Sequence, residues 1–394
     1  MKHTKKLMAL LLAVLLIAST FSFALAADPA DIAGYTTVDY GKCGQNVNWY
    51  YAQNGAGERS IFIKGTGAMD NYSPSNLPQW VKLRENIDTV VIKEGVTSVG
   101  DYAFAECTNL EKVTLEKGVQ TIGASAFAKS GMLSTVKFSE QLTSIGESAF
   151  EKCYALKTMD LPAGLKTIGR YAFFECRNLS SEVVIPKGVS VVPDFAFFRC
   201  YSIPSLVLKE GVTSIGNSAF SWCFGLKKVE LPKSLLSMNN GVFAECSGLT
   251  SIKIPEKVTE IPASAFACTY YDESAKNFLG LPSWLEIKET KNESSLSEVT
   301  MYKTVSIIRD SAFYGCPISK VTFYGTSGDW ERVWVEANND SLKGAERVFF
   351  TWTTDTKPAG TPCKYCGETH GDSFGQKITA FFHKVLAFFG LKKK

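Results

Sequence analysis

The clearest chemical motif in the 394-residue sequence is the segment Cys363-Lys-Tyr-Cys366 near its end. Two thiolates at this spacing can chelate zinc, and His370 and His383 could complete a set of four ligands. The same thiols can instead close a disulfide within the motif or stay reduced. The sequence leaves these alternatives open, and zinc at this motif is the one cofactor that it suggests.

Histidine-based catalysis is not expected in the main part of the chain. The three histidines are His3, His370 and His383, so a nucleophile activated by histidine is excluded from residues 27–362. The 39 acidic residues offer many carboxylate pairs, but none lies in a recognisable catalytic motif. We therefore predict that the protein is not an enzyme, and a carboxylate site without a motif stays open as the alternative.

Most cysteines fall in a regular series, three residues after a phenylalanine: Cys107, Cys153, Cys176, Cys200, Cys223, Cys246 and Cys316, with Ser130 in the same position. The total of eleven cysteines is odd, which suits a disulfide framework poorly. Free cysteine is among the residue types most often buried. We therefore interpret this series as buried stacking residues, with disulfides or a redox or metal ladder as the alternatives.

The series belongs to a repeat, which is the element that must position every candidate residue. Ala-Phe recurs with its phenylalanine mostly 23 residues apart, at Phe104, Phe127, Phe150, Phe173, Phe197, Phe220, Phe266 and Phe313, and Val-Phe at Phe243 fills the gap. Alternating apolar residues such as Val113 and Leu115 follow each unit and predict a strand with one buried face. About nine such units predict a repeat solenoid with parallel β-strands and short helical turns that place the phenylalanine inside.

The ends and one gap interrupt this regularity. We expect an N-terminal cap over residues 27–94, a solenoid over 95–325 and a C-terminal cap over 326–353. Between Phe266 and Phe313 the spacing is 47 residues, which predicts an insertion at about 267–295, and the repeat frame resumes at Leu296. The insertion is a decayed repeat or a protruding loop, and a decayed repeat that carries a loop is the favoured interpretation.

With this pattern the sequence resembles the BspA-like leucine-rich repeat surface proteins of bacteria. The resemblance covers about residues 90–325, and one unit reads Ile145-Gly-Glu-Ser-Ala-Phe150-Glu-Lys-Cys153-Tyr-Ala-Leu156-Lys-Thr-Met159-Asp-Leu161-Pro162. It implies a curved solenoid, export and a surface role such as adhesion to protein or glycan. It implies no shared catalytic residue and no single ligand.

The first 26 residues are typical of a secretory signal peptide, which predicts a secreted or cell-surface protein. Lys2, Lys5 and Lys6 precede an apolar stretch, and Ala24-Leu25-Ala26 suits cleavage. Without this segment, 39 basic residues balance 39 acidic ones. No clustered basic charge marks a nucleic-acid partner.

Aromatic side chains beside the repeat phenylalanines are the candidate ligand-binding residues: Tyr154, Phe174, Phe198, Tyr201, Trp222 and Phe224. If they point outward, they form an apolar stripe for a protein or glycan ligand. If they pack against adjacent coils, their role is structural. A structural component of the cell envelope, without a specific soluble ligand, is the alternative function.

The last residues differ in composition from the repeats. Residues 354–373 read as a linker that contains the cysteine motif. Residues 374–394 have apolar positions at helical spacing, interrupted by Lys377 and Lys384 and followed by three lysines. We expect an amphipathic helix that associates with a membrane or cell wall, or that folds back on the C-terminal cap.

Overall fold

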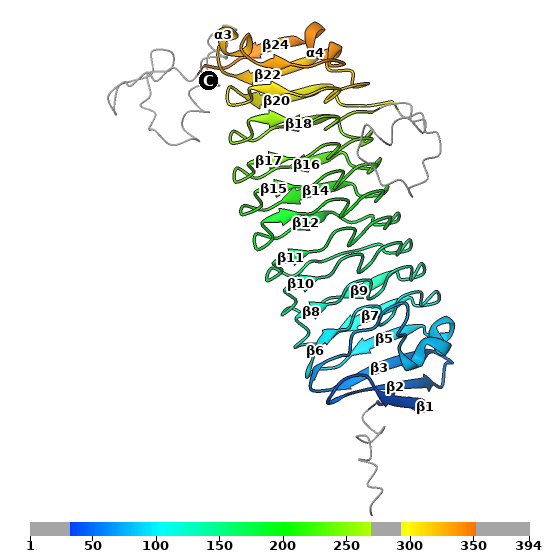
Figure 1. Ribbon diagram of the computed structural model, residues 1–394. Coiled ribbons are helices and arrows are strands. Elements are labelled where there is room, and N and C mark those ends of the chain that lie inside the picture. The colour runs from blue at the N-terminus through cyan, green and yellow to red at the C-terminus, as the bar shows by residue number, and fades with distance from the viewer. Residues whose placement is uncertain (1–31, 269–292, 352–394) are drawn as a thin grey trace, which may run out of the picture. The chain divides into compact units, whose positions relative to one another are not determined.

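The computed structural model describes residues 32–268 and 293–351 of the chain. These residues wind into a parallel-strand β-solenoid of about ten turns with little helix, as the sequence predicts (Figure 1). The expected signal peptide 1–26, the linker motif and the helix 374–394 lie outside the described residues.

One side of the solenoid is a row of strands that continues from coil to coil in three sheets. The first sheet comprises β1 (Tyr35–Lys42), β2 (Val47–Asn54), β3 (Arg59–Gly65), β5 (Thr89–Ile92), β7 (Lys112–Leu115) and β9 (Thr135–Lys137). The second comprises β12 (Val183–Ile185), β14 (Ser205–Leu208) and β16 (Lys228–Glu230), and the third β18 (Ser251–Lys253), β20 (Glu298–Tyr302), β22 (Lys320–Tyr324) and β24 (Glu346–Phe349).

A second row of shorter strands follows in the same coils. Its sheets are β4 (Gly67–Ala68), β6 (Val96–Val99), β8 (Thr121–Ile122), β10 (Ser144–Ile145) and β11 (Thr167–Ile168); β13 (Val191–Val192), β15 (Ser214–Ile215) and β17 (Ser237–Met238); and β19 (Glu260–Ile261), β21 (Ile307–Ile308) and β23 (Trp334–Val335). The described helices are the 3-10 helix η2 (Gln79–Asn86), α3 (Ser327–Trp330) and α4 (Asp340–Gly344).

The strand pattern follows from the alternation of apolar and polar residues. In β7, Val113 and Leu115 are buried whereas Lys112 is exposed. Val113 pairs with Val90 on one side and with Val136 on the other, all in parallel register. Equivalent apolar residues of successive coils therefore stack inside the solenoid, and no single coil has to bury its own face.

The repeat phenylalanines form a continuous column in the core. Neighbouring rings from Phe104 to Phe313 stack with centroids 5.1–5.7 Å apart and nearly parallel planes. These distances lie within the range that favours offset stacking. The column explains why Phe recurs at this position, because a smaller residue would leave a cavity between two rings.

The described segments around the phenylalanines are short turns, as expected, and do not form regular helices. Residues two positions before and after the ring have positive φ, for example Tyr102 (53°) and Glu106 (59°) around Phe104. This alternation interrupts the α-helical conformation, and the bonds within the segment are turn bonds between residues three apart, such as Ala105 to Tyr102 at 3.3 Å. It directs the amides of Tyr102, Phe104 and Glu106 to carbonyl groups of the next coil at 2.7–2.9 Å.

The predicted resumption of the repeat frame is confirmed, whereas a decayed repeat inside the stack is wrong. Strand β20 pairs directly with β18, with Val299 beside Ile252. The rings of Phe266 and Phe313 also stack directly, at 5.2 Å. Because these coils are immediate neighbours, no additional coil lies between them, and residues 269–292 lie outside the described part.

Two side chains satisfy the backbone groups that the first and last turns would otherwise leave unpaired. The Trp80 indole N–H donates to the Ala103 carbonyl at 2.9 Å, and its ring stacks on Phe104. At the other end, Asn339 Oδ1 accepts from the Phe313 amide at 2.9 Å, and Asn339 Nδ2 donates to the Arg309 carbonyl at 2.9 Å. Both side chains are almost fully buried.

Candidate binding surface on the turn face

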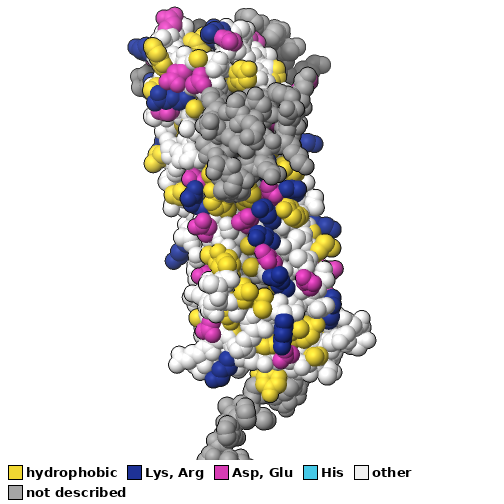
Figure 2. Space-filling view, turned by 45° about the vertical axis from the view of Figure 1, so that its right-hand side comes forward, with side chains coloured by type: hydrophobic (Ala, Val, Ile, Leu, Met, Phe, Trp, Pro, Cys, Tyr) yellow, Lys and Arg dark blue, Asp and Glu magenta, His cyan; other side chains and the backbone are white. Residues whose placement is uncertain are grey.

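The turns around the repeat phenylalanines form one side of the solenoid, here called the turn face. Because the same turn recurs in every coil, the side chains one, two and four residues after the phenylalanine form columns along it, here called columns +1, +2 and +4. Seen from one side, the solenoid surface mixes Lys and Arg with Asp and Glu, with hydrophobic side chains between them (Figure 2).

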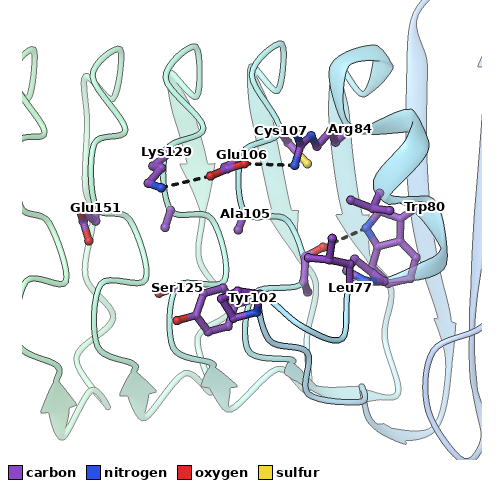
Figure 3. Close-up of a pocket in the computed structure, with 15 residues that line it drawn as sticks. Leu77, Trp80, Arg84, Tyr102, Ala105, Glu106, Cys107, Ser125, Lys129 and Glu151 are labelled. Atoms are coloured by element: carbon purple, nitrogen blue, oxygen red, sulfur yellow. Dashed lines mark hydrogen bonds and ion pairs between the residues drawn. The ribbon is translucent and has the colours of Figure 1, made fainter.

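A groove of about 520 Å³ opens on the N-terminal part of the turn face. It extends from η2 over the coils of Phe104 and Phe127 to Glu151 (Figure 3). Ala105 and Ala128 line it in the middle, and Leu77, which is 50% exposed, lines it near η2. This arrangement offers a shallow apolar surface that a side chain of a partner molecule can cover.

Column +1 changes in residue size along the groove. Its first two members, Ala105 and Ala128, are small, whereas Glu151 and then Phe174 follow in the next coils. The alanines and Glu151 line the groove, whereas Phe174 is fully buried and does not.

A row of charges borders the groove, supplied by η2 and column +2. Arg84 and Lys129 each contact Glu106 at 3.1 Å, from opposite sides (Figure 3). All three side chains are at least 37% exposed, so these pairs contribute little to stability. They are available to exchange partners with charged groups of a ligand.

The prediction of an outward aromatic stripe is wrong for Phe174, Phe198 and Trp222. All three are at most 2% exposed and form a second core cluster beneath the turn face. The Phe174 and Phe198 rings stack at 5.3 Å, and Phe198 and Trp222 at 6.0 Å. They are buried because the close spacing of adjacent coils covers each ring with the next.

The remaining predicted residues, Tyr154, Tyr201 and Phe224, belong to column +4 and are partly exposed. Tyr201 and Phe224 stack at 5.1 Å and are packed against the second core cluster. Tyr154 is 36% exposed. Arg177, which sequence reasoning did not select, lies between Tyr154 and Tyr201, with its guanidinium 4.6 and 5.7 Å from their ring centroids.

A buried ion pair lies next to this column and was also not predicted. Glu175 contacts Arg199 at 2.9 Å, and both side chains are less than 10% exposed. Glu175 also contacts Arg177 at 2.6 Å. The sequence signal was the presence of opposite charges in column +2 of adjacent coils, as in Glu106 with Lys129 and in Glu175 with Arg199. A buried pair of this kind is weak evidence for stability by itself.

The described cysteines are buried and form no disulfide with one another, in agreement with the interpretation as stacking residues. Most thiols of the series also donate to a phenylalanine carbonyl of the preceding coil, as Cys176 does to Phe150 at 3.3 Å. Ser130 makes the equivalent bond to Phe104 at 3.0 Å. Burial raises the pKa of the Cys107 thiol to about 12, so these cysteines are poor nucleophiles.

The predicted metal ligands Cys363, Cys366, His370 and His383 lie outside the described residues. Within residues 32–268 and 293–351, no three histidine, cysteine or acidic side chains are grouped so that they could hold a metal ion. No helix of these ranges has the length and apolar character needed to cross a bilayer.

Comparison with known proteins identifies the repeat. The sequence model of the BspA type leucine-rich repeat region matches in six copies, over residues 82–200, 180–276 and 286–330. These ranges include more than half of the chain. No curated protein matches significantly.

Several solved structures are similar. A leucine-rich repeat protein from Eubacterium ventriosum is 20% identical, with 79% of this chain and 85% of that chain covered and a TM-score of 0.46. A leucine-rich cell surface protein from Faecalibacterium prausnitzii is 18% identical over 77% of this chain and 99% of that chain, with a TM-score of 0.32. The Treponema pallidum leucine-rich repeat protein is 26% identical over 51% of this chain and 87% of that chain, with a TM-score of 0.41.

Proposed function

The chain belongs to the BspA-type leucine-rich repeat family, and from this premise we propose that it is an exported surface protein that binds a partner protein through its turn face. The family suggests a protein-interaction role at the cell surface. Repeat proteins of this family are generally not enzymes, and we propose none of the catalytic roles considered for the carboxylates. The expected signal peptide supports export.

The groove on the turn face is the observation that carries this proposal. Its floor of Ala105 and Ala128 is apolar, its end near η2 exposes Leu77, and its border holds Arg84, Glu106 and Lys129. Apolar centres with polar borders are typical of protein interfaces. An extended segment of the partner would place an aliphatic side chain over the alanines and charged groups against the row of ion pairs.

A substitution that fills the groove tests this proposal. Ala105→Phe places a ring in column +1. The same column already holds phenylalanine in two later coils, at Phe174 and Phe198, so the turn can accept this side chain. Tyr314→Ala, in the same column of the last repeat coil and 49% exposed, is the matched control. The probe is a library of 12-residue peptides displayed on phage and selected on the folded wild-type protein.

We expect peptides that bind the wild type and the Tyr314→Ala variant equally and lose binding to Ala105→Phe. Circular dichroism and thermal unfolding check that both variants keep the fold. If no peptide binds saturably, or if selected peptides bind Ala105→Phe as tightly as the wild type, the groove is not the interaction site. A purely structural role in the cell envelope is then the better explanation.

A further inference from the structure

Column +4 contains a run of planar side chains that stack on each other across four consecutive coils. Its members are Tyr154, Arg177, Tyr201 and Phe224, with spacings of 4.6, 5.7 and 5.1 Å. The inner members have a planar neighbour on both faces. Only a ring at the end of this run can offer a free face to a ligand.

The run ends at Gly131, which occupies column +4 in the coil before Tyr154. A Cβ atom built on Gly131 would approach only Tyr154 Cδ2, at 3.5 Å, and would otherwise meet open space. The glycine therefore contributes no side chain to the column next to the Tyr154 ring, and Tyr154 is 36% exposed. The next member of the column, Thr108, is exposed and lies one coil further.

The free ring is held in a fixed orientation from its other side. The Arg177 guanidinium lies 4.6 Å from the Tyr154 centroid and is itself fixed by an ion pair with Glu175 at 2.6 Å. Backbone bonds connect the same coils, from Asn178 to the Tyr154 carbonyl at 3.2 Å and from Ala155 to the Gly131 carbonyl at 3.0 Å. A ligand that stacks here does not have to order the ring first, which reduces the entropic cost of binding.

The width of this slot suits one flat ring. Two coil spacings of about 4.8 Å separate the backbones at Thr108 and Tyr154, and Gly131 forms the floor between them. Among the described residues, the hydroxyl groups of Thr108 and Tyr154 have no hydrogen-bond partner. Column +4 holds no carboxylate at Thr108, Gly131 or Tyr154 that would select a cation.

From this combination we propose that Tyr154, Gly131 and Thr108 form a subsite for a pyranose ring of a neutral glycan. One C–H face of the sugar stacks on Tyr154, and its hydroxyl groups bond with the free hydroxyls of Tyr154 and Thr108. An aromatic side chain of a partner protein would also stack, but it would leave these hydroxyl groups unused. The subsite lies in a different column from the groove and does not depend on the proposed protein partner.

Affinity electrophoresis of the full-length protein in gels that contain dextran, mannan or galactan tests the proposal. Gly131→Tyr extends the stack and occupies the slot, whereas Tyr154→Ala removes the platform. Both substitutions are expected to weaken binding by up to about tenfold, because an aromatic stacking contact contributes up to about 1.5 kcal/mol. Tyr314→Ala and Ala105→Phe, which lie outside the slot, should bind like the wild type.

Circular dichroism of each variant confirms that the solenoid is intact. The proposal is overturned if none of the three polysaccharides retards the wild type, or if Gly131→Tyr is retarded as strongly as the wild type. Competition by N-acetyltyrosine amide but not by free monosaccharides would also overturn it, because the slot would then accept a protein side chain.

Discussion

Replacing Trp80 with phenylalanine tests whether a single side chain completes the N-terminal end of the solenoid. The new ring can still stack on Phe104, but it lacks the N–H group that donates to the Ala103 carbonyl. Among the described residues no other donor reaches the Ala103 carbonyl. The equivalent carbonyl of the next coil, that of Ala126, accepts from the Phe104 amide. The substitution therefore leaves a buried acceptor unpaired.

The expected loss follows from two contributions. An unpaired buried polar group costs about 1–3 kcal/mol, and the smaller ring gives up about 1 kcal/mol of apolar burial. We expect Trp80→Phe to lower the free energy of unfolding by about 2–4 kcal/mol. Trp334→Phe is the matched control, because Trp334 is 68% exposed and its replacement should change stability by less than about 0.5 kcal/mol.

Urea unfolding followed by far-ultraviolet circular dichroism measures both variants without relying on tryptophan fluorescence. Hydrogen exchange should also show faster exchange of the Phe104 and Phe127 amides in Trp80→Phe, because the lost contact opens the stack from its end. The reasoning is refuted if Trp80→Phe is as stable as Trp334→Phe, or if its additional exchange occurs mainly near the C-terminal coils.

Two further predictions concern buried and ion-paired polar groups. Ser130→Ala should lower the free energy of unfolding in urea by about 1 kcal/mol, because the bond to the Phe104 carbonyl is lost. Ser130→Cys should be close to neutral, and equal losses in the two variants would contradict the role given to the cysteine series. The pKa of Asp88 is lowered in the folded protein, first by side-chain hydrogen bonds from Arg59. The ionised carboxylate therefore stabilises the fold fully at a pH above its ordinary pKa near 4, and this stabilisation is lost as the pH falls through the lowered pKa of the folded state. Asp88→Asn should therefore be about 1 kcal/mol less stable than the wild type at pH 7 and converge with it near pH 2; an equal difference at both pH values would contradict this.

The repeat period predicted the solenoid well because each position has one environment in every coil. The same offset that aligns Phe266 with Phe313 placed β20 beside β18 across the insertion. The turn conformation was not predictable in this way. Positive φ at residues such as Tyr102 and Phe195 contradicts their local preferences and is imposed by hydrogen bonds to the next coil.

The candidate site was predicted only in part, because exposure depends on neighbours in other coils. Phe198 and Tyr154 look equivalent as aromatic residues near a repeat phenylalanine, yet one is buried and the other is exposed. The two residues lie in different columns, and each has a different neighbour at the same position of the preceding coil. Tyr154 follows Gly131, whereas Phe198 follows Phe174, and this comparison was available in the aligned repeats.

The end groups at Trp80 and Asn339 have a consequence for how the molecule can change in length. In the internal coils, the amides of the repeat phenylalanine and of the residues two positions before and after it all donate to the next coil. This set of bonds leaves acceptors at the first coil and donors at the last, so each end needs its own complementary group. These backbone bonds are the same between any two internal coils. Gene duplication or loss of one 23-residue unit would therefore lengthen or shorten the turn face in steps, without requiring either end group to evolve anew.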